Sequence, residues 1–193
     1  MVLIFTPPSL KQIKAAAFWS VLGFAFLMAS CNGSDENTAE SLSAGLAFVE
    51  TGQAIQAENY HYRLIFSPGE VSLITSGGQE EVEMPFRNTF TEVQPEFSAE
   101  TGEVRYRELY PGTDLRFYDK GNGNAGYDFA LKPGADPAAI SFPVPEKAFV
   151  DENGLNIPMN DGLLVHSNPV TYQEIEGERV EVESRFTLAD GLV

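Results

Sequence analysis

The stretch that decides the fold is residues 104–118, VRYRELYPGTDLRFY. Its first half alternates apolar side chains with Arg105 and Arg107, and a period of two is typical of a strand that buries one face. Pro111-Gly112 then supplies turn residues before a second alternating run begins. The stretch therefore predicts two antiparallel strands joined by a turn.

The same alternation of strand and turn continues over most of the chain after residue 60. Residues 180–188 alternate apolar and polar side chains, so we expect a strand with one buried face there. Residues 41–48 have room for two helical turns, and residues 136–140 predict one capped turn. Turn residues separate the runs at short intervals: Ser67-Pro68-Gly69, Gly77-Gly78, Gly121-Asn122-Gly123-Asn124, Asn153-Gly154, Asn160-Asp161-Gly162 and Glu176-Gly177.

These patterns predict an all-β fold, an antiparallel β-sandwich or meander of hairpins with about nine to eleven strands. The large apolar side chains on either side of two of the turns sit at strand spacing, so we expect them to share one core. The predicted core cluster is Tyr106, Tyr110, Leu115, Phe117, Tyr127 and Phe129.

An export signal precedes this domain in the sequence. Lys11 and Lys14 are followed by the apolar residues 15–29, which is the order of charge, apolar core and small residues found in signal peptides. A membrane span needs about 20 apolar residues, so a run of 15 is short for an uncleaved anchor. We therefore expect a signal-peptide helix ahead of the β domain.

The signal ends in Leu27-Met28-Ala29-Ser30-Cys31, which resembles the lipobox of bacterial lipoproteins. In that box the signal is cut just before a cysteine whose sulfur carries a diacylglycerol. Met28 departs from it, because the box prefers Leu, Val or Ile there. The resemblance implies that Cys31 is the lipidation site and that the protein is held on a bacterial cell-envelope membrane by its lipid. We expect the outer membrane, on either its periplasmic or its surface face.

Three regions follow from this interpretation: a lipoprotein signal peptide (1–30), a flexible acidic and polar tether (31–45) and a single β-rich domain (46–193). Loss of the signal removes two lysines and no acids, so the net charge falls from −16 to −18. Such a charge repels nucleic acid, which we exclude as a partner. Envelope or surface proteins remain possible partners. Cys31 is the only cysteine, so its lipidation rules out a disulfide framework.

No arrangement typical of an enzyme is visible in the sequence. His61 and His166 each lie in a strand-like run, where a lone histidine is more often an exposed or hydrogen-bonded bystander. Carboxylate pairs such as Asp114 with Asp119 have a residue type used in glycoside hydrolysis, but 28 acidic residues supply such pairs by chance. We expect a protein that is not an enzyme.

Calcium is the more serious candidate ligand. Asp119, Asn122, Asn124 and Asp128 carry the oxygen donors that a hard cation prefers. Their spacing differs from a calcium loop, because glycines stand where donors are expected, and a hairpin loop explains them better. We therefore expect no metal and no cofactor besides the covalent lipid, and keep calcium as a disfavoured alternative.

Several motifs together resemble a known family. The order and spacing are similar to the domain of unknown function at the N-terminal end of bacterial SBBP-repeat (β-propeller repeat) surface proteins. The motifs are FVETGQ (48–53), VRYRELYPGTDL (104–115), FY (117–118), YDF (127–129), PGADP (133–137) and NPVTYQEIEG (168–177).

This resemblance covers residues 46–188 and implies a module type and a location, with no catalytic residues to transfer. Three functions stay open: a non-catalytic lipoprotein module that serves an interaction in the envelope, a glycan- or calcium-binding module, and a truncated fragment of a larger propeller surface protein.

Overall fold

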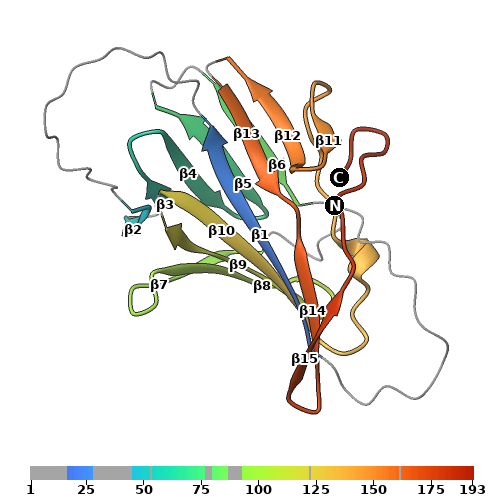
Figure 1. The fold of residues 1–193 in the computed structure, drawn as a ribbon. Helices are drawn as coiled ribbons and strands as arrows, with labels where there is room; N and C mark the ends of the chain where they lie inside the picture. The colour runs from blue at the N-terminus through green and yellow to red at the C-terminus, as the bar shows by residue number, and fades with distance from the viewer. Residues whose placement is uncertain are drawn as a thin grey trace, which may run out of the picture.

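The chain folds into two antiparallel β-sheets that pack face to face (Figure 1). The computed structural model describes residues 17–27 (backbone only), 45–52, 54–76, 80–86, 93–121, 123–160 and 162–193. The predicted all-β class is confirmed, and the antiparallel pairing of neighbouring strands matches the predicted hairpins.

The smaller sheet is a meander in which each strand pairs with the next along the chain. Buried and more exposed residues alternate along three of its five strands, so one face is buried and the other meets solvent. Its strands, in spatial order, are β2 (Ala47–Thr51), β3 (Ala54–Glu58), β4 (Tyr62–Ser67), β5 (Glu70–Thr75) and β6 (Glu81–Pro85).

The larger sheet has ten strands, in the order β11-β12-β13-β1-β10-β9-β8-β7, with β14 beside β1 and β15 at its edge. Its strands are β1 (Ala17–Leu27), β7 (Pro95–Ser98), β8 (Glu103–Tyr110), β9 (Thr113–Gly121), β10 (Asn124–Leu131), β11 (Phe149–Asp151), β12 (Gly154–Met159), β13 (Gly162–Ser167), β14 (Val170–Ile175) and β15 (Glu178–Val182).

Strand β1 lies in the middle of the larger sheet (Figure 1). On one side, residues 18–23 pair with residues 126–131 of β10. On the other side, residues 17–21 pair with β14 and residues 24–27 pair with β13. A single segment thus joins two groups of strands, β7 to β10 and β11 to β15, into one sheet.

The signal-peptide helix predicted from the sequence is wrong over residues 17–27, because these residues form an extended strand. A short apolar run fits a buried strand as well as a helix, and periodicity alone does not separate the two. The neighbouring strands decide the outcome, since β10 and β13–β14 present backbone groups that an inserted strand can pair. The remaining residues of the predicted signal lie outside the described residues.

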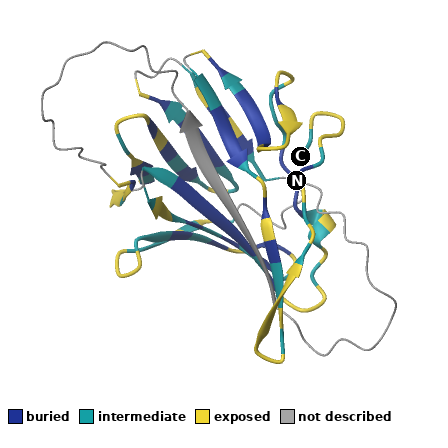
Figure 2. Cartoon of the chain, in the orientation of Figure 1, coloured by how far each residue is buried: buried dark blue, intermediate teal, exposed yellow. Residues whose placement is uncertain are grey.

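The core lies between the two sheets, and all six side chains of the predicted core cluster belong to it. Phe66 of β4 meets Phe117 of β9 edge-on, with ring centroids 5.1 Å apart. The Tyr106 hydroxyl on β8 lies 2.9 Å from the carbonyl oxygens of Ser67 and of Glu70, at the turn between β4 and β5. Figure 2 shows the buried residues concentrated on the central strands of both sheets.

The fifteen described strands exceed the predicted nine to eleven, because several runs divide at turns or bulges. The predicted capped turn is confirmed as η1 (Pro137–Ala139), with Asp136 accepting from the backbone N–H of Ala138. The suggested helix over 41–48 is wrong where it overlaps β2. The strand predicted over 180–188 ends at Val182. Of the residues after it, Phe186 still enters the core.

Candidate functional site

Two of the residues that the sequence singled out lie outside the described residues. These are Cys31, the predicted lipidation site, and Asn122, one of the calcium candidates. After β1, the described chain resumes at Gly45. The predicted tether therefore carries no structural description before Gly45.

Of the remaining calcium candidates, Asp119 and Asp128 lie apart and make other contacts, and Asn124 begins β10 opposite Gly121. The Asp119 carboxylate accepts the backbone N–H of Gly121 at 2.8 Å and so closes the β9–β10 turn. Asp119 is paired with Ala125 across the two strands, and Asp128 is paired with Arg116. These two pairs are three positions apart along the strands, which corresponds to about 10 Å. Within the described residues, no group of three His, Cys, Asp or Glu side chains is placed to hold a metal.

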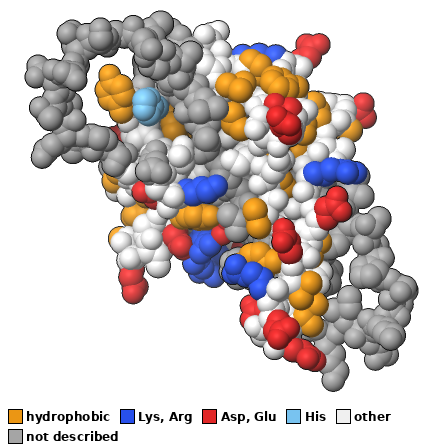
Figure 3. All heavy atoms as spheres, viewed as in Figure 1, with side chains coloured by type: hydrophobic (Ala, Val, Ile, Leu, Met, Phe, Trp, Pro, Cys, Tyr) orange, Lys and Arg blue, Asp and Glu red, His pale blue; other side chains and the backbone are white. Residues whose placement is uncertain are grey.

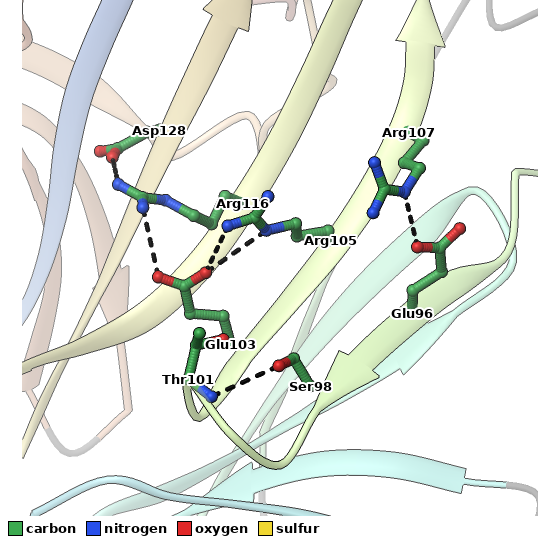
Figure 4. A network of polar contacts seen from close by, with 8 residues as sticks. All are labelled: Glu96, Ser98, Thr101, Glu103, Arg105, Arg107, Arg116 and Asp128. Carbon is green, nitrogen blue, oxygen red and sulfur yellow. Dashed lines mark hydrogen bonds and ion pairs between the residues drawn. The ribbon is translucent and has the colours of Figure 1, made fainter.

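Asp128 belongs instead to an ion-pair array on the outer face of β8, β9 and β10. Arg116 bridges two carboxylates: it pairs with Asp128 through Nη2 and with Glu103 through Nη1 at 3.2 Å. Arg105 binds the other oxygen of Glu103 at 2.8 Å. Figure 4 shows the alternation of charge, with Glu103 between the two guanidinium groups and Asp128 at the far end. Each charge of the array therefore faces an opposite one.

The array continues through Tyr118, whose hydroxyl lies 3.1 Å from Asp128 and whose ring lies 5.0 Å from the Arg116 guanidinium carbon. Gly126 makes room for that ring, because a Cβ there would lie 2.6 Å from it. Burial raises the pKa of the Asp128 carboxyl, and the hydrogen bond and charge of Arg116 oppose that rise. Burial, followed by the Asp128 charge, raises the pKa of Tyr118 to about 12. The array therefore links three neighbouring strands through opposite charges.

A second polar contact lies inside the core, beneath β1. The Tyr127 hydroxyl on β10 is 2.9 Å from Nδ1 of His166 on β13. Both side chains are buried, and Phe142 stacks on the imidazole ring with centroids 6.0 Å apart. Burial lowers the pKa of His166 to about 3 and raises that of Tyr127. The histidine is therefore neutral at physiological pH.

The two histidines lie in different environments, and only His166 is in a strand. His61 is exposed in the bend before β4, and His166 is a buried, hydrogen-bonded residue. The sequence did not predict the Tyr127–His166 contact, because the two residues are 39 positions apart and meet only through the strand order. The alternation of Arg105 and Arg107 indicated an exposed charged face, but the partners on β9 and β10 depend on register.

The chain has a net charge of −16, but acidic and basic side chains are mixed on its surface (Figure 3). Figure 3 shows Asp and Glu side chains spread over the visible face, with Lys and Arg between them. Among the described residues, no helix is long and apolar enough to cross a membrane.

Comparison with known proteins identifies a family for the chain. Neither the curated proteins nor the solved structures contain a match to the chain. A family model described as "Domain of unknown function (DUF7948)" matches residues 23–193, and so covers both sheets and the last five residues of β1. Since the match extends over most of the 193 residues, the chain belongs to this family of domains of unknown function, DUF7948.

Proposed function

We propose that this protein is a non-catalytic lipoprotein of the bacterial cell envelope whose β-sandwich serves as an interaction module. The observation that carries the proposal is the position of Cys31, directly after an apolar segment with the order of an export signal. The polar residues 32–37 that follow Cys31 suit a tether between a lipid and a folded domain. The lipid on Cys31 would be the membrane contact.

Lipid anchoring is tested by metabolic labelling with a palmitate analogue. Wild type should incorporate the label and show an intact mass that begins at Cys31, and Cys31→Ser should lose both. A matched control is the double variant Cys31→Ser with Ser34→Cys, which restores a thiol three residues downstream and should stay unlabelled. Labelling of either variant would contradict the assignment of Cys31.

The non-catalytic part of the proposal is supported by the pairing of the polar side chains with one another. Arg116 is paired with both Glu103 and Asp128, and phenylalanine rings contact both Tyr127 and His166. Catalysis needs a group that can reach a substrate and change its protonation or bonding state. The described clusters offer an ordered scaffold, which suits an interaction module better than an enzyme.

The likeness to domains that precede propeller repeats supports a role next to other surface modules. Under this proposal the chain, or a longer product that contains it, presents the sandwich beside further repeats or envelope proteins. The sequence of the gene beyond the codon for Val193 tests this directly. An in-frame continuation with propeller repeats would identify the chain as the head of a larger surface protein, and a stop codon would favour the stand-alone lipoprotein.

The face of the outer membrane is tested by treating intact cells with a protease. Acidic, exposed hairpins such as β14–β15 offer cleavage sites to a protease that cuts after Glu. Digestion in intact cells would place the domain on the surface, and digestion only after permeabilisation would place it in the periplasm.

A further inference from the structure

We propose that the gap between β10 and β13–β14 is a strand-acceptor slot, which another polypeptide fills with an extended, uncharged segment once residues 1–30 are removed. The inference rests on the proposed cleavage before Cys31, because that cleavage takes away β1, the strand that occupies the slot in this structure (Figure 1). The inference specifies where the proposed interaction module binds its partner and what kind of segment the partner provides.

The slot is defined by backbone groups on two sides. Residues 126–131 of β10 form one edge, and residues 163–166 of β13 with 170–174 of β14 form the other. Removal of β1 would leave both edges unpaired in the middle of the sheet. Unpaired backbone groups away from water are costly, and open strand edges are templates for pairing with another chain. Such an edge recruits peptides by adding a strand.

The buried contact between Tyr127 and His166 holds the slot one strand wide. Tyr127 is paired with position 22 of β1 and His166 with position 24, so the two residues stand on opposite sides of the inserted strand. Their side chains meet beneath it at 2.9 Å. Two strands that flank a third are about 9.5 Å apart, roughly twice the distance between direct neighbours. Direct pairing of β10 with β13 would require this core contact to rearrange.

The occupant's chemistry follows from the residues that line each face of the slot. On the core side lie the buried Tyr127 and Phe129 of β10 and Leu164 of β13. On the outer side, position 21 of the inserted strand is paired with Asp128. Directly paired residues in a sheet share a face, so alternate positions of the ligand must be apolar, while the others tolerate polar side chains.

The chain itself offers no spare strand for the slot among its described residues. The longest uncharged run after Cys31 is residues 162–173, which already forms β13 and most of β14. A second copy could fill the slot only with a strand that is displaced from its own sheet. We therefore assign the occupant to a different polypeptide with an uncharged segment of about the length of β1.

The test uses the processed protein purified from envelopes, whose intact mass shows whether residues 1–30 are gone. The probe is a peptide of residues 17–27 with flanking lysines for solubility. It carries Trp19, the only tryptophan of the precursor, so its fluorescence reports binding without a background from the processed protein. We expect saturable binding with a blue-shifted emission, and a rise in the melting temperature of the protein.

Two peptide variants separate slot binding from nonspecific adhesion. Leu22→Lys places a charge at the position paired with the buried Tyr127 and should weaken binding at least tenfold. Val21→Lys places the same charge at the position paired with Asp128 and should bind within about threefold of the parent peptide.

Each result decides one part of the proposal. A purified protein that retains residues 17–27 would overturn both the lipoprotein assignment and the open slot. A processed protein that does not bind the peptide, or that binds both variants equally, would overturn the slot proposal and leave the lipoprotein assignment standing. A processed protein that elutes as a dimer and excludes the peptide would show that a second copy fills the slot, which overturns the assignment to a foreign strand.

Discussion

Tyr127 and His166 are two titratable side chains that meet inside the core. The hydrogen bond between them satisfies a polar atom of each, which is the condition under which such groups are tolerated away from water. At the outer face, the buried carboxylate of Asp128 is satisfied by an ion pair with Arg116. Both contacts link residues on different strands, so single side chains here control how strands are held together.

The buried histidine makes stability depend on pH. Its pKa is about 3 in the folded protein, against about 6.5 when exposed in the unfolded chain. Between these values the unfolded state binds a proton that the folded state does not, so the free energy of unfolding falls as pH decreases below about 6.5. The slope reaches about 1.4 kcal/mol per pH unit. Urea titrations between pH 7 and pH 4 should measure this loss.

The control for this dependence is His166→Gln, which retains a polar side chain and cannot titrate. Asp128 also titrates, with a pKa that burial raises, but its contribution is common to both proteins and cancels in the comparison. The variant should lose less stability than wild type as the solution is acidified. Equal slopes in the two proteins would contradict the burial of a neutral imidazole.

The ion-pair array gives a second prediction for single residues. Asp128 is 2% exposed, and Asp128→Asn removes one of the two carboxylates that pair with Arg116. We expect a loss of about 1–3 kcal/mol in the free energy of unfolding. Glu96→Gln removes the carboxylate of the exposed pair with Arg107 and should change stability by less than about 1 kcal/mol. Equal losses from both changes, measured by urea denaturation, would argue against a buried role for Asp128.

Among the secondary-structure elements, the β9–β10 hairpin contributes several large buried side chains to the core. Phe129 on β10 is 1% exposed and packs near Tyr110 and Tyr127. Truncation to alanine in such a site removes apolar contacts and leaves a cavity, so Phe129→Ala should cost about 3–5 kcal/mol. Chemical denaturation measures the loss. Val180→Ala on the exposed β15 should stay within about 0.5 kcal/mol, and a loss below about 1 kcal/mol for Phe129→Ala would contradict this packing.

The loop of the same hairpin gives a prediction about calcium. Asp119 is turned back onto the N–H of Gly121, and Asp128 is paired with Arg116, so neither is arranged with the other around a cation. We expect millimolar calcium to leave the melting temperature unchanged. A calcium-dependent rise that disappears in Asp119→Ala would contradict the hairpin interpretation and identify a site for a cation.

Local pattern predicted the hairpins and the six core residues, because alternation along a strand directly determines which face is buried. It did not predict β1 as a strand, since a largely apolar segment of eleven residues fits a signal helix or a central strand, and only the neighbouring edges decide between them. The irregularity in β8 was also missed. There Glu108 has a φ of 50° and its N–H donates to Asp114, a geometry set by the register with β9.

At the scale of the whole molecule, one core joins two sheets, and tyrosines reach across it. Tyr62 of β4 donates to the Gly123 carbonyl oxygen at 2.8 Å and accepts the N–H of Ala125 at 2.9 Å. Tyr106 of β8 reaches carbonyl oxygens of the opposite sheet. The sheets therefore share apolar packing and polar contacts, and neither is expected to keep its structure when the other unfolds.

This coupling predicts a single unfolding transition that Tyr106→Phe shifts without splitting. The variant keeps the ring in the core but leaves the carbonyl oxygens of Ser67 and Glu70 without the hydroxyl donor, which should cost about 1–3 kcal/mol. For a chain of this length each kcal/mol lowers the melting temperature by about 2–4 °C. Far-ultraviolet circular dichroism, which follows the backbone, and tyrosine absorbance, which follows the core, should give coincident curves in both proteins. Exposed Tyr60 serves as the control, since Tyr60→Phe should leave the transition in place. Sheets that share one core are expected to unfold together. Two separated transitions in wild type would therefore show that the sheets unfold independently.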